Sequence, residues 1–150
     1  MQSIPSRHDG RKQRPHCIYC SLAGICGVTR LTDYCASKFA AVGFEECLRL
    51  ELYDEGYTGI HSTVVCPFFI NTGMFDGANS GIFAMLEPEY VADEIVASVL
   101  VNKEVVIIPS YFLILVILKT LAPAKMAFRM GTTFELDRAM HGFKGRQKTD

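Results

Sequence analysis

Apolar and polar positions along this chain change period repeatedly, which predicts strands separated by helices. Residues 16–21 are a short apolar run and predict a buried strand. Residues 34–54 have helical spacing and predict a helix. The positions expected to form its buried stripe are Ala41, Phe44, Leu48 and Leu52, whereas those expected on its wetter faces are Glu45, Glu46, Arg49 and Glu51.

The second half of the chain continues the same alternation. Residues 61–66, rich in Val and Thr, predict another strand. Glu87-Pro88-Glu89 has the proline and carboxylates typical of a helix N-terminus. The side chains expected to face inward on that helix are Val91, Ala92, Ile95 and Val99. Residues 105–108 predict a third strand, which Pro109 stops. This order of elements predicts an α/β fold with a parallel sheet.

The segment Tyr111 to Leu118 is apolar throughout and extends to Leu121. It is shorter than the roughly 20 residues that a membrane-spanning helix needs. Two interpretations stay open. The segment is either a buried helix that closes a hydrophobic pocket, or an interfacial helix in lipid with Lys119, Lys125 and Arg129 near the headgroups.

Composition indicates a globular α/β protein, with 49% hydrophobic residues and a formal net charge of −1. No excess of basic charge points to nucleic acid. The six cysteines, without a secretory signal, are expected to be reduced thiols in a cytosol-facing protein. Residues 1–15 are polar and basic, do not continue the pattern, and are expected to be a disordered tail.

A zinc site is the other interpretation of the first cysteines. Cys17 and Cys20 are three residues apart, beside His16 and before Cys26. Residues three apart in a strand point to opposite faces, which works against a shared metal. We therefore expect buried thiols here and no metal.

Tyr34 and Lys38 are the candidate catalytic residues whose spacing is most informative. They are four positions apart, so they lie on one face of the predicted helix. An ammonium near a phenol favours the phenolate, which moves a tyrosine toward general acid/base chemistry at neutral pH. Ser21, thirteen residues before Tyr34, ends the predicted strand and is the second candidate.

Three segments together resemble a known family. They are Cys17-Ile18-Tyr19-Cys20-Ser21, Tyr34-Cys35-Ala36-Ser37-Lys38, and residues 64–75 with their Pro67 and Thr72. The combination resembles the short-chain dehydrogenases/reductases over about residues 16–145. Residues 33–44 and Leu86-Glu87-Pro88-Glu89 resemble its membrane-associated retinol and hydroxysteroid dehydrogenases, especially the epidermal retinol dehydrogenase group.

The resemblance implies a role for each candidate residue. Tyr34 corresponds to the general acid/base, and Lys38 to the residue that activates it and holds the nicotinamide ribose. Ser21 corresponds to the residue that orients the substrate oxygen. Pro67 and Thr72 correspond to the cofactor-binding segment, with Thr72 at the nicotinamide carboxamide. The implied cofactor is NAD or NADP.

The family's glycine-rich dinucleotide loop is not found in these 150 residues. Gly24 and Gly27 lack its full spacing. We therefore expect residues 16–150 to be the C-terminal catalytic and substrate half of such a domain: a partial Rossmann-type parallel sheet, half of a doubly wound domain, with C-terminal apolar helices. In the family the strand at 16–21 is interior, so one of its edges is expected to be unpaired here.

The function that the resemblance implies is NAD(P)-dependent interconversion of a lipophilic alcohol and its carbonyl, of the retinoid, steroid or fatty alcohol class, with this chain alone expected to be inactive. The alternative is a non-catalytic, membrane-associated or interaction protein derived from such an enzyme. Expected partners are a lipophilic small molecule, a membrane or lipid-droplet surface and a second copy of the chain. The expected location is the cytosolic side of the endoplasmic reticulum or a lipid droplet, otherwise the cytoplasm.

Overall fold

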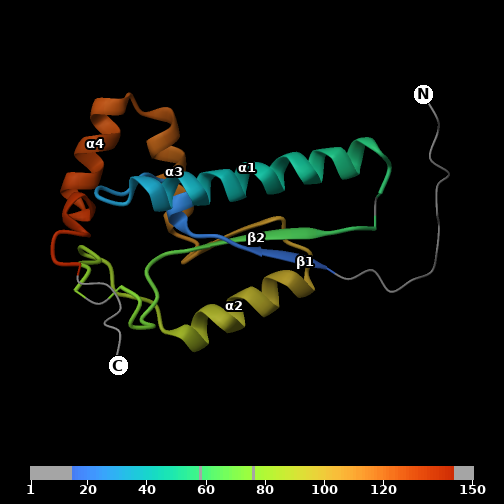
Figure 1. Cartoon of the computed structure of the whole chain (residues 1–150), viewed down its shortest axis with the longest axis horizontal. Coiled ribbons are helices and arrows are strands. Elements are labelled where there is room, and N and C mark those ends of the chain that lie inside the picture. The colour runs from blue at the N-terminus through green and yellow to red at the C-terminus, as the bar shows by residue number, and fades with distance from the viewer. Residues whose placement is uncertain (1–14, 58, 76, 144–150) are drawn as a thin grey trace.

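The computed structural model describes residues 15–57, 59–75 and 77–143 (Figure 1). In chain order the strands and helices are β1 His16–Tyr19, α1 Thr32–Asp54, β2 Ser62–Pro67, α2 Pro88–Leu100, β3 Val105–Ile108, α3 Phe112–Leu121 and α4 Ala124–Thr133. Two short 3₁₀ turns, η1 Leu22–Gly24 and η2 Leu136–Arg138, follow β1 and α4. The tail expected at residues 1–15 falls, except for Pro15, outside the described residues.

The three strands form one parallel sheet in the order β1-β2-β3. Cys17 lies opposite Thr63, and Val65 lies opposite Val106. Helix α1 covers one face of the sheet and α2 the other, while α3 and α4 lie at one end (Figure 1). Parallel strands joined by helices are the arrangement that the alternating sequence pattern predicted, so the α/β fold is confirmed.

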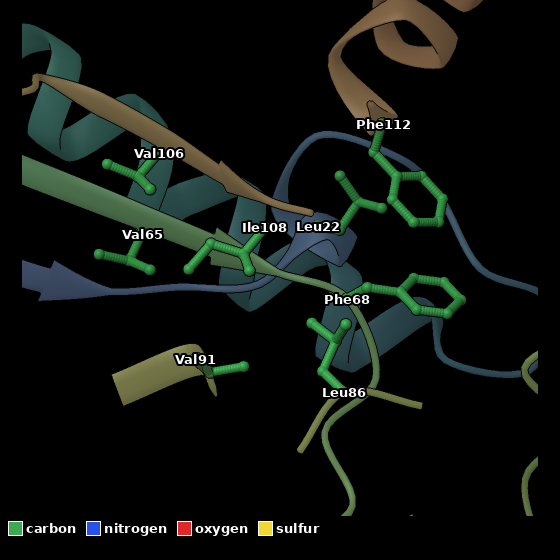
Figure 2. Packing of buried hydrophobic residues seen from close by; sticks show 8 residues of the cluster. All are labelled: Leu22, Val65, Phe68, Leu86, Val91, Val106, Ile108 and Phe112. Carbon is green, nitrogen blue, oxygen red and sulfur yellow. The ribbon is translucent and has the colours of Figure 1, made fainter. Parts of the chain in front are cut away.

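The larger hydrophobic core is on the α2 side of the sheet. Figure 2 shows side chains from the strands, from α2 and from the start of α3 converging there. Its buried members are Leu22, Val65, Phe68, Leu86, Val91, Val106, Ile108 and Phe112. The rings of Phe68 and Phe112 stack with centroids 4.6 Å apart. A smaller core of Cys20, Val64 and Cys66 packs against Ala41 and Val42 of α1 on the opposite face.

Strand β1 differs from the prediction of a buried strand at residues 16–21. Among the described residues it pairs only with β2, and His16, Cys17 and Tyr19 are exposed. Burial begins at Cys20, after the strand has ended. An apolar run identifies a strand, but its burial depends on the neighbours that cover it, and here only one edge has a neighbour.

The predicted faces of α1 are wrong at two positions, one in the expected buried stripe and one on the expected wet face. Phe44 is 63% exposed, whereas Glu45, expected on a wet face, is 1% exposed. The buried Glu45 carboxylate accepts a hydrogen bond from Ser62 Oγ at 2.6 Å and lies 3.7 Å from Arg49 Nε. Arg49 also pairs with Glu104 at the start of β3. A carboxylate is tolerated in a protein interior when such partners compensate for its lost hydration.

Helix α2 follows the prediction at most positions. It begins with Pro88 at its first turn, and Val91 is buried in the core. Ile95 packs against that core, but Ala92 is exposed and does not face inward. The buried small residue of this helix is instead Ser98.

Helices α3 and α4 bury only part of their apolar surface. Phe112 is buried, and Leu115 and Val116 pack against the core. The side chains that stay exposed, here called the α3–α4 apolar surface, are Leu113, Ile114, Ile117, Leu118, Leu121, Met126 and Phe128. No helix in the part of the chain that the structure describes has the length and apolar character to cross a membrane.

The contrast between Phe112 and Phe44 is directly testable. Phe112→Ala removes a ring that is 2% exposed and should lower the free energy of unfolding by about 3–5 kcal/mol. Phe44→Ala removes the same atoms from a solvated face and should change it by less than about 0.5 kcal/mol. Chemical denaturation followed by circular dichroism measures both. A large loss for Phe44→Ala would contradict the orientation of α1.

Candidate active site

A cavity opens at the carboxyl ends of β1 and β2, where open parallel sheets commonly bind ligands. The volume of the cavity, including the open space at its mouth, is about 590 Å³. The residues lining it include Ser21 after β1, Tyr34 in the first turn of α1 and Pro67 at the end of β2. Three of the five candidate residues therefore border one cavity.

Tyr34 and Lys38 are neighbours on α1, one helical turn apart. The Lys38 ammonium lies 5.6 Å from the centre of the Tyr34 ring. The ring is also held by an edge-to-face contact with Phe75, with centroids 6.5 Å apart. Tyr34 and Lys38 are both half-buried, but only Tyr34 lines the cavity. Lys38 thus stands behind the phenol rather than in the cavity wall.

Ser21 is positioned by the turn that ends β1. Its backbone is extended, and its hydroxyl oxygen accepts a hydrogen bond from the Ala23 amide at 3.2 Å, which caps η1. Gly24 in that turn lies so close to Cys20 Sγ and the Lys38 carbonyl that a Cβ would stand 2.7 and 2.8 Å from them. This close approach packs the turn after Ser21 against α1 at Lys38 and Val42. The hydroxyl proton of Ser21 remains available to a ligand oxygen in the cavity.

Pro67 and Thr72 have different placements. Pro67 is buried and lines the cavity, and the following Phe68 amide bonds to the Ile108 carbonyl at 2.8 Å. Thr72 is exposed and does not line the cavity; its amide bonds to the Ile70 carbonyl at 2.9 Å. Thr72 therefore lies outside the cavity, although Phe69 and Phe75 on either side of it in the sequence line the cavity.

Most of the cavity wall is apolar, and sequence reasoning missed several of its members. Phe69 and Phe75 come from the segment after β2, with ring centroids 5.0 Å apart. Leu136 and Ala139 come from η2 and the residue after it, more than a hundred positions beyond Tyr34. Residues 136–139 show no helical or strand periodicity that could have identified them. Only tertiary packing brings them to the site.

Tyr19, Cys26 and Cys66, at this end of the sheet, have pKa values raised above their usual range. Burial, with a smaller contribution from Tyr34, raises the pKa of Tyr19. Burial and the adjacent Cys20 raise the pKa of Cys66 to about 12. Burial also raises the pKa of Cys26, although Lys119 partly opposes this. None of these groups is an activated nucleophile.

The arrangement suits proton exchange with an oxygen on an apolar ligand. A phenol and a hydroxyl border an otherwise largely apolar cavity, and an ammonium stands behind the phenol. No group of three histidine, cysteine or acidic side chains within the described ranges is close enough to hold a metal ion. The chemistry that these residues offer is therefore hydrogen bonding and acid/base catalysis.

Comparison with known proteins identifies relatives that are dehydrogenases. Residues 17–82 match the family model for short chain dehydrogenase. The chain is 40% identical over 131 residues to human epidermal retinol dehydrogenase 2, covering 85% of this chain and 42% of that protein. It is 39% identical over 112 residues to mouse 17-beta-hydroxysteroid dehydrogenase 13, covering 73% of this chain and 36% of that protein. The chain thus spans less than half the length of these curated relatives.

Solved structures show the same fold at lower sequence identity. A short chain dehydrogenase from Burkholderia cenocepacia in complex with NADP superposes with a TM-score of 0.65 at 16% identity, covering 79% of this chain and 47% of that one. A short chain dehydrogenase/reductase from Burkholderia phymatum in complex with NAD gives a TM-score of 0.60, also at 16% identity, covering 79% of this chain and 50% of that one.

Proposed function

This chain belongs to the short-chain dehydrogenase family, and from that premise we propose that it carries the proton-transfer and substrate-binding half of an oxidoreductase. The proposed reaction interconverts a lipophilic alcohol and its carbonyl compound. The observation that carries the proposal is the meeting of Ser21 and Tyr34 around one largely apolar cavity, with Lys38 beside the phenol. The retinoid or steroid class of substrate is supported by the curated names of the relatives.

In this proposal each residue has one chemical task. In the oxidation direction the Tyr34 phenolate takes the hydroxyl proton of the substrate, and in reduction the phenol returns it to the carbonyl oxygen. Lys38 stabilises the phenolate by its positive charge. The Ser21 hydroxyl donates a hydrogen bond to the substrate oxygen and fixes its orientation.

The proposed cofactor is NAD or NADP, which accepts or supplies the hydride when bound. Two structural neighbours hold these dinucleotides. Pro67 and Lys38 are the residues of this chain proposed to contact the nicotinamide half, because Pro67 lines the cavity at the end of β2 and Lys38 lies beside the Tyr34 ring on α1. Thr72 is proposed for the carboxamide only in a state where its loop turns toward the cavity, since it is exposed here.

The role of Tyr34 is best tested by grafting. Residues 16–143 replace the matching segment of human epidermal retinol dehydrogenase 2. The human protein then supplies the rest of a full-length chain. Turnover of an apolar alcohol with NAD(P) is expected, and Tyr34→Phe should lower kcat by about 10²–10⁴-fold, because it removes the transferable proton. Cofactor affinity, measured by fluorescence titration, should change little.

Phe69→Leu, a change in the apolar wall, is the matched control for the graft. It should alter KM more than kcat, since Phe69 offers no proton. A Tyr34→Phe graft that keeps full kcat would refute the proposed role of Tyr34.

The second candidate is a non-catalytic protein that retains the substrate half, and it concerns these 150 residues by themselves, in which no glycine-rich dinucleotide loop is found. The loop's backbone amides and helix N-terminus normally hold the pyrophosphate. We expect the 150-residue polypeptide, produced by itself, to bind NAD(H) and NADP(H) only in the millimolar range. Titration calorimetry measures this, and low-micromolar binding would refute the prediction and remove the support for the second candidate.

We also propose that the α3–α4 apolar surface rests on a lipid surface, on the endoplasmic reticulum or a lipid droplet. Leu121 and Phe128 are 79% and 64% exposed, and Lys125 and Arg129 are exposed on the same helix as Phe128. Apolar side chains with neighbouring cations favour the interface of an anionic membrane. Lys119 is left out of this proposal, because its ammonium donates to the Ile25 carbonyl at 2.6 Å.

Charge reversal tests this surface. Lys125→Glu with Arg129→Glu should weaken binding of the chain to phosphatidylserine-containing vesicles by roughly tenfold or more, at about 1 kcal/mol for each basic residue at the membrane. Lys103→Glu, an exposed lysine just before β3, is the control and should have little effect. Vesicle co-sedimentation gives the affinities. Equal losses for the double variant and for the control would argue against the α3–α4 apolar surface as the contact.

A further inference from the structure

Lys119, in the last turn of α3, is half-buried and forms no ion pair with a carboxylate of the described residues. Its ammonium instead donates to the Ile25 carbonyl at 2.6 Å and lies 5.8 Å from the centre of the Phe39 ring. Ile25 belongs to the loop between β1 and α1, and Phe39 belongs to α1. One cation therefore joins α3 both to this loop and to α1.

The loop that Lys119 contacts lies between Ser21 and Tyr34. Residues 25–31, here called the connecting loop, follow η1, which Ser21 caps, and precede α1, whose first turn carries Tyr34. Four residues of the connecting loop line the cavity beside Tyr34: Cys26, Gly27, Val28 and Leu31. A displacement of this loop would therefore change the cavity wall and the separation of the Ser21 hydroxyl from the Tyr34 phenol together.

The connecting loop depends on contacts with the C-terminal part of the chain for its shape. Its Arg30 has a φ of 65°, in the left-handed region that persists at a non-glycine residue only where the surroundings hold it. Within the described ranges no backbone amide bonds to the Ile25 carbonyl, so Lys119 is its hydrogen-bond donor. The Thr29 hydroxyl donates to the Asp137 carbonyl of η2. Two side-chain hydrogen bonds thus hold a loop that has no regular structure of its own.

The contact with Phe39 extends the effect of Lys119 to the helix that carries Tyr34 and Lys38. A cation within about 6 Å of an aromatic ring is attracted to its face. Phe39 follows Lys38 directly, and the same turn is contacted from β1, because the Cys20 thiol donates to the Lys38 carbonyl at 3.3 Å. Lys119 therefore contacts this turn of α1 as well as the connecting loop.

We propose that Lys119 is a positioning residue for Ser21 and Tyr34. Its ammonium holds the connecting loop against α1, so that the Ser21 hydroxyl and the Tyr34 phenol reach the same substrate oxygen. Hydrogen bonds from a charged donor are stronger than neutral ones, which suits Lys119 to this task. The inference rests on the proposed function for the roles of Ser21 and Tyr34. Lys119 itself transfers no proton and touches neither substrate nor cofactor.

Hydrogen exchange of the 150-residue chain, measured by mass spectrometry, tests the contact without cofactor or turnover. Lys119→Met keeps a long side chain but removes the charge and the donor protons. The loop amides that are hydrogen-bonded here should then exchange about tenfold faster, because the loop opens more often: Cys26, Val28 and Leu31. Lys119→Arg keeps a charged donor and should exchange as the unchanged chain does. Lys103→Met, at an exposed lysine before β3, is the control and should have no effect.

Kinetic coupling in the graft of residues 16–143 tests the consequence for the site. Lys119→Met should lower kcat about tenfold and change KM by less than about twofold, and Lys119→Arg should restore most of the loss. In a Ser21→Ala background the same change should lower kcat by less than about threefold, because the hydroxyl to be positioned is gone. A merely structural role would give equal losses in both backgrounds, since independent effects add. Circular dichroism melting checks that each variant is folded.

Three results would overturn the inference: unchanged exchange of the connecting loop in Lys119→Met, equally fast exchange in Lys103→Met, or equal losses of kcat with and without the Ser21 hydroxyl. Failure of the proposed function would instead appear as full kcat in the Tyr34→Phe graft. The exchange measurement needs no turnover, so the two failures are distinguishable.

Discussion

Strand β2 is buried on both faces and hydrogen-bonded along both edges, and the rest of the fold takes its position from it. Residues 62–67 are all buried, with β1 on one side, β3 on the other, α1 above and α2 below. A strand in this position needs apolar residues on both faces, which is why its sequence shows a continuous run rather than alternation. Ser62 and Thr63 are the polar exceptions, and the buried Glu45 carboxylate is the partner of Ser62.

The site follows from the direction of the strands. Because β1 and β2 are parallel, the residues that follow them emerge at the same edge of the sheet, and Ser21 and Pro67 meet there. Gly24 lets the turn after β1 approach α1 closely, which brings Tyr34 to the same cavity. The chemistry is thus placed by backbone topology, while η2 and the segment after β2 supply the apolar surroundings.

Unburied apolar surface is the other main property of this chain. The edge of β1 has no partner among the described residues, and the α3–α4 apolar surface faces outward. Hydrocarbon exposed on this scale favours association with other apolar surfaces. For α3 and α4 the proposed occupant is lipid.

The sequence by itself determined the order of the elements, the α/β class and the local motifs, because periodicity and spacing are local properties. It placed β3 and the start of α2 correctly, and Tyr34 and Lys38 one turn apart. Tertiary structure alone decided which faces are covered: Glu45 is buried because Ser62 and Arg49 lie beside it, and Phe44 is exposed because no element among the described residues covers that side of α1. It also brought Leu136 to the cavity beside Tyr34, which the sequence could not predict because long-range packing leaves no periodic pattern in a short turn.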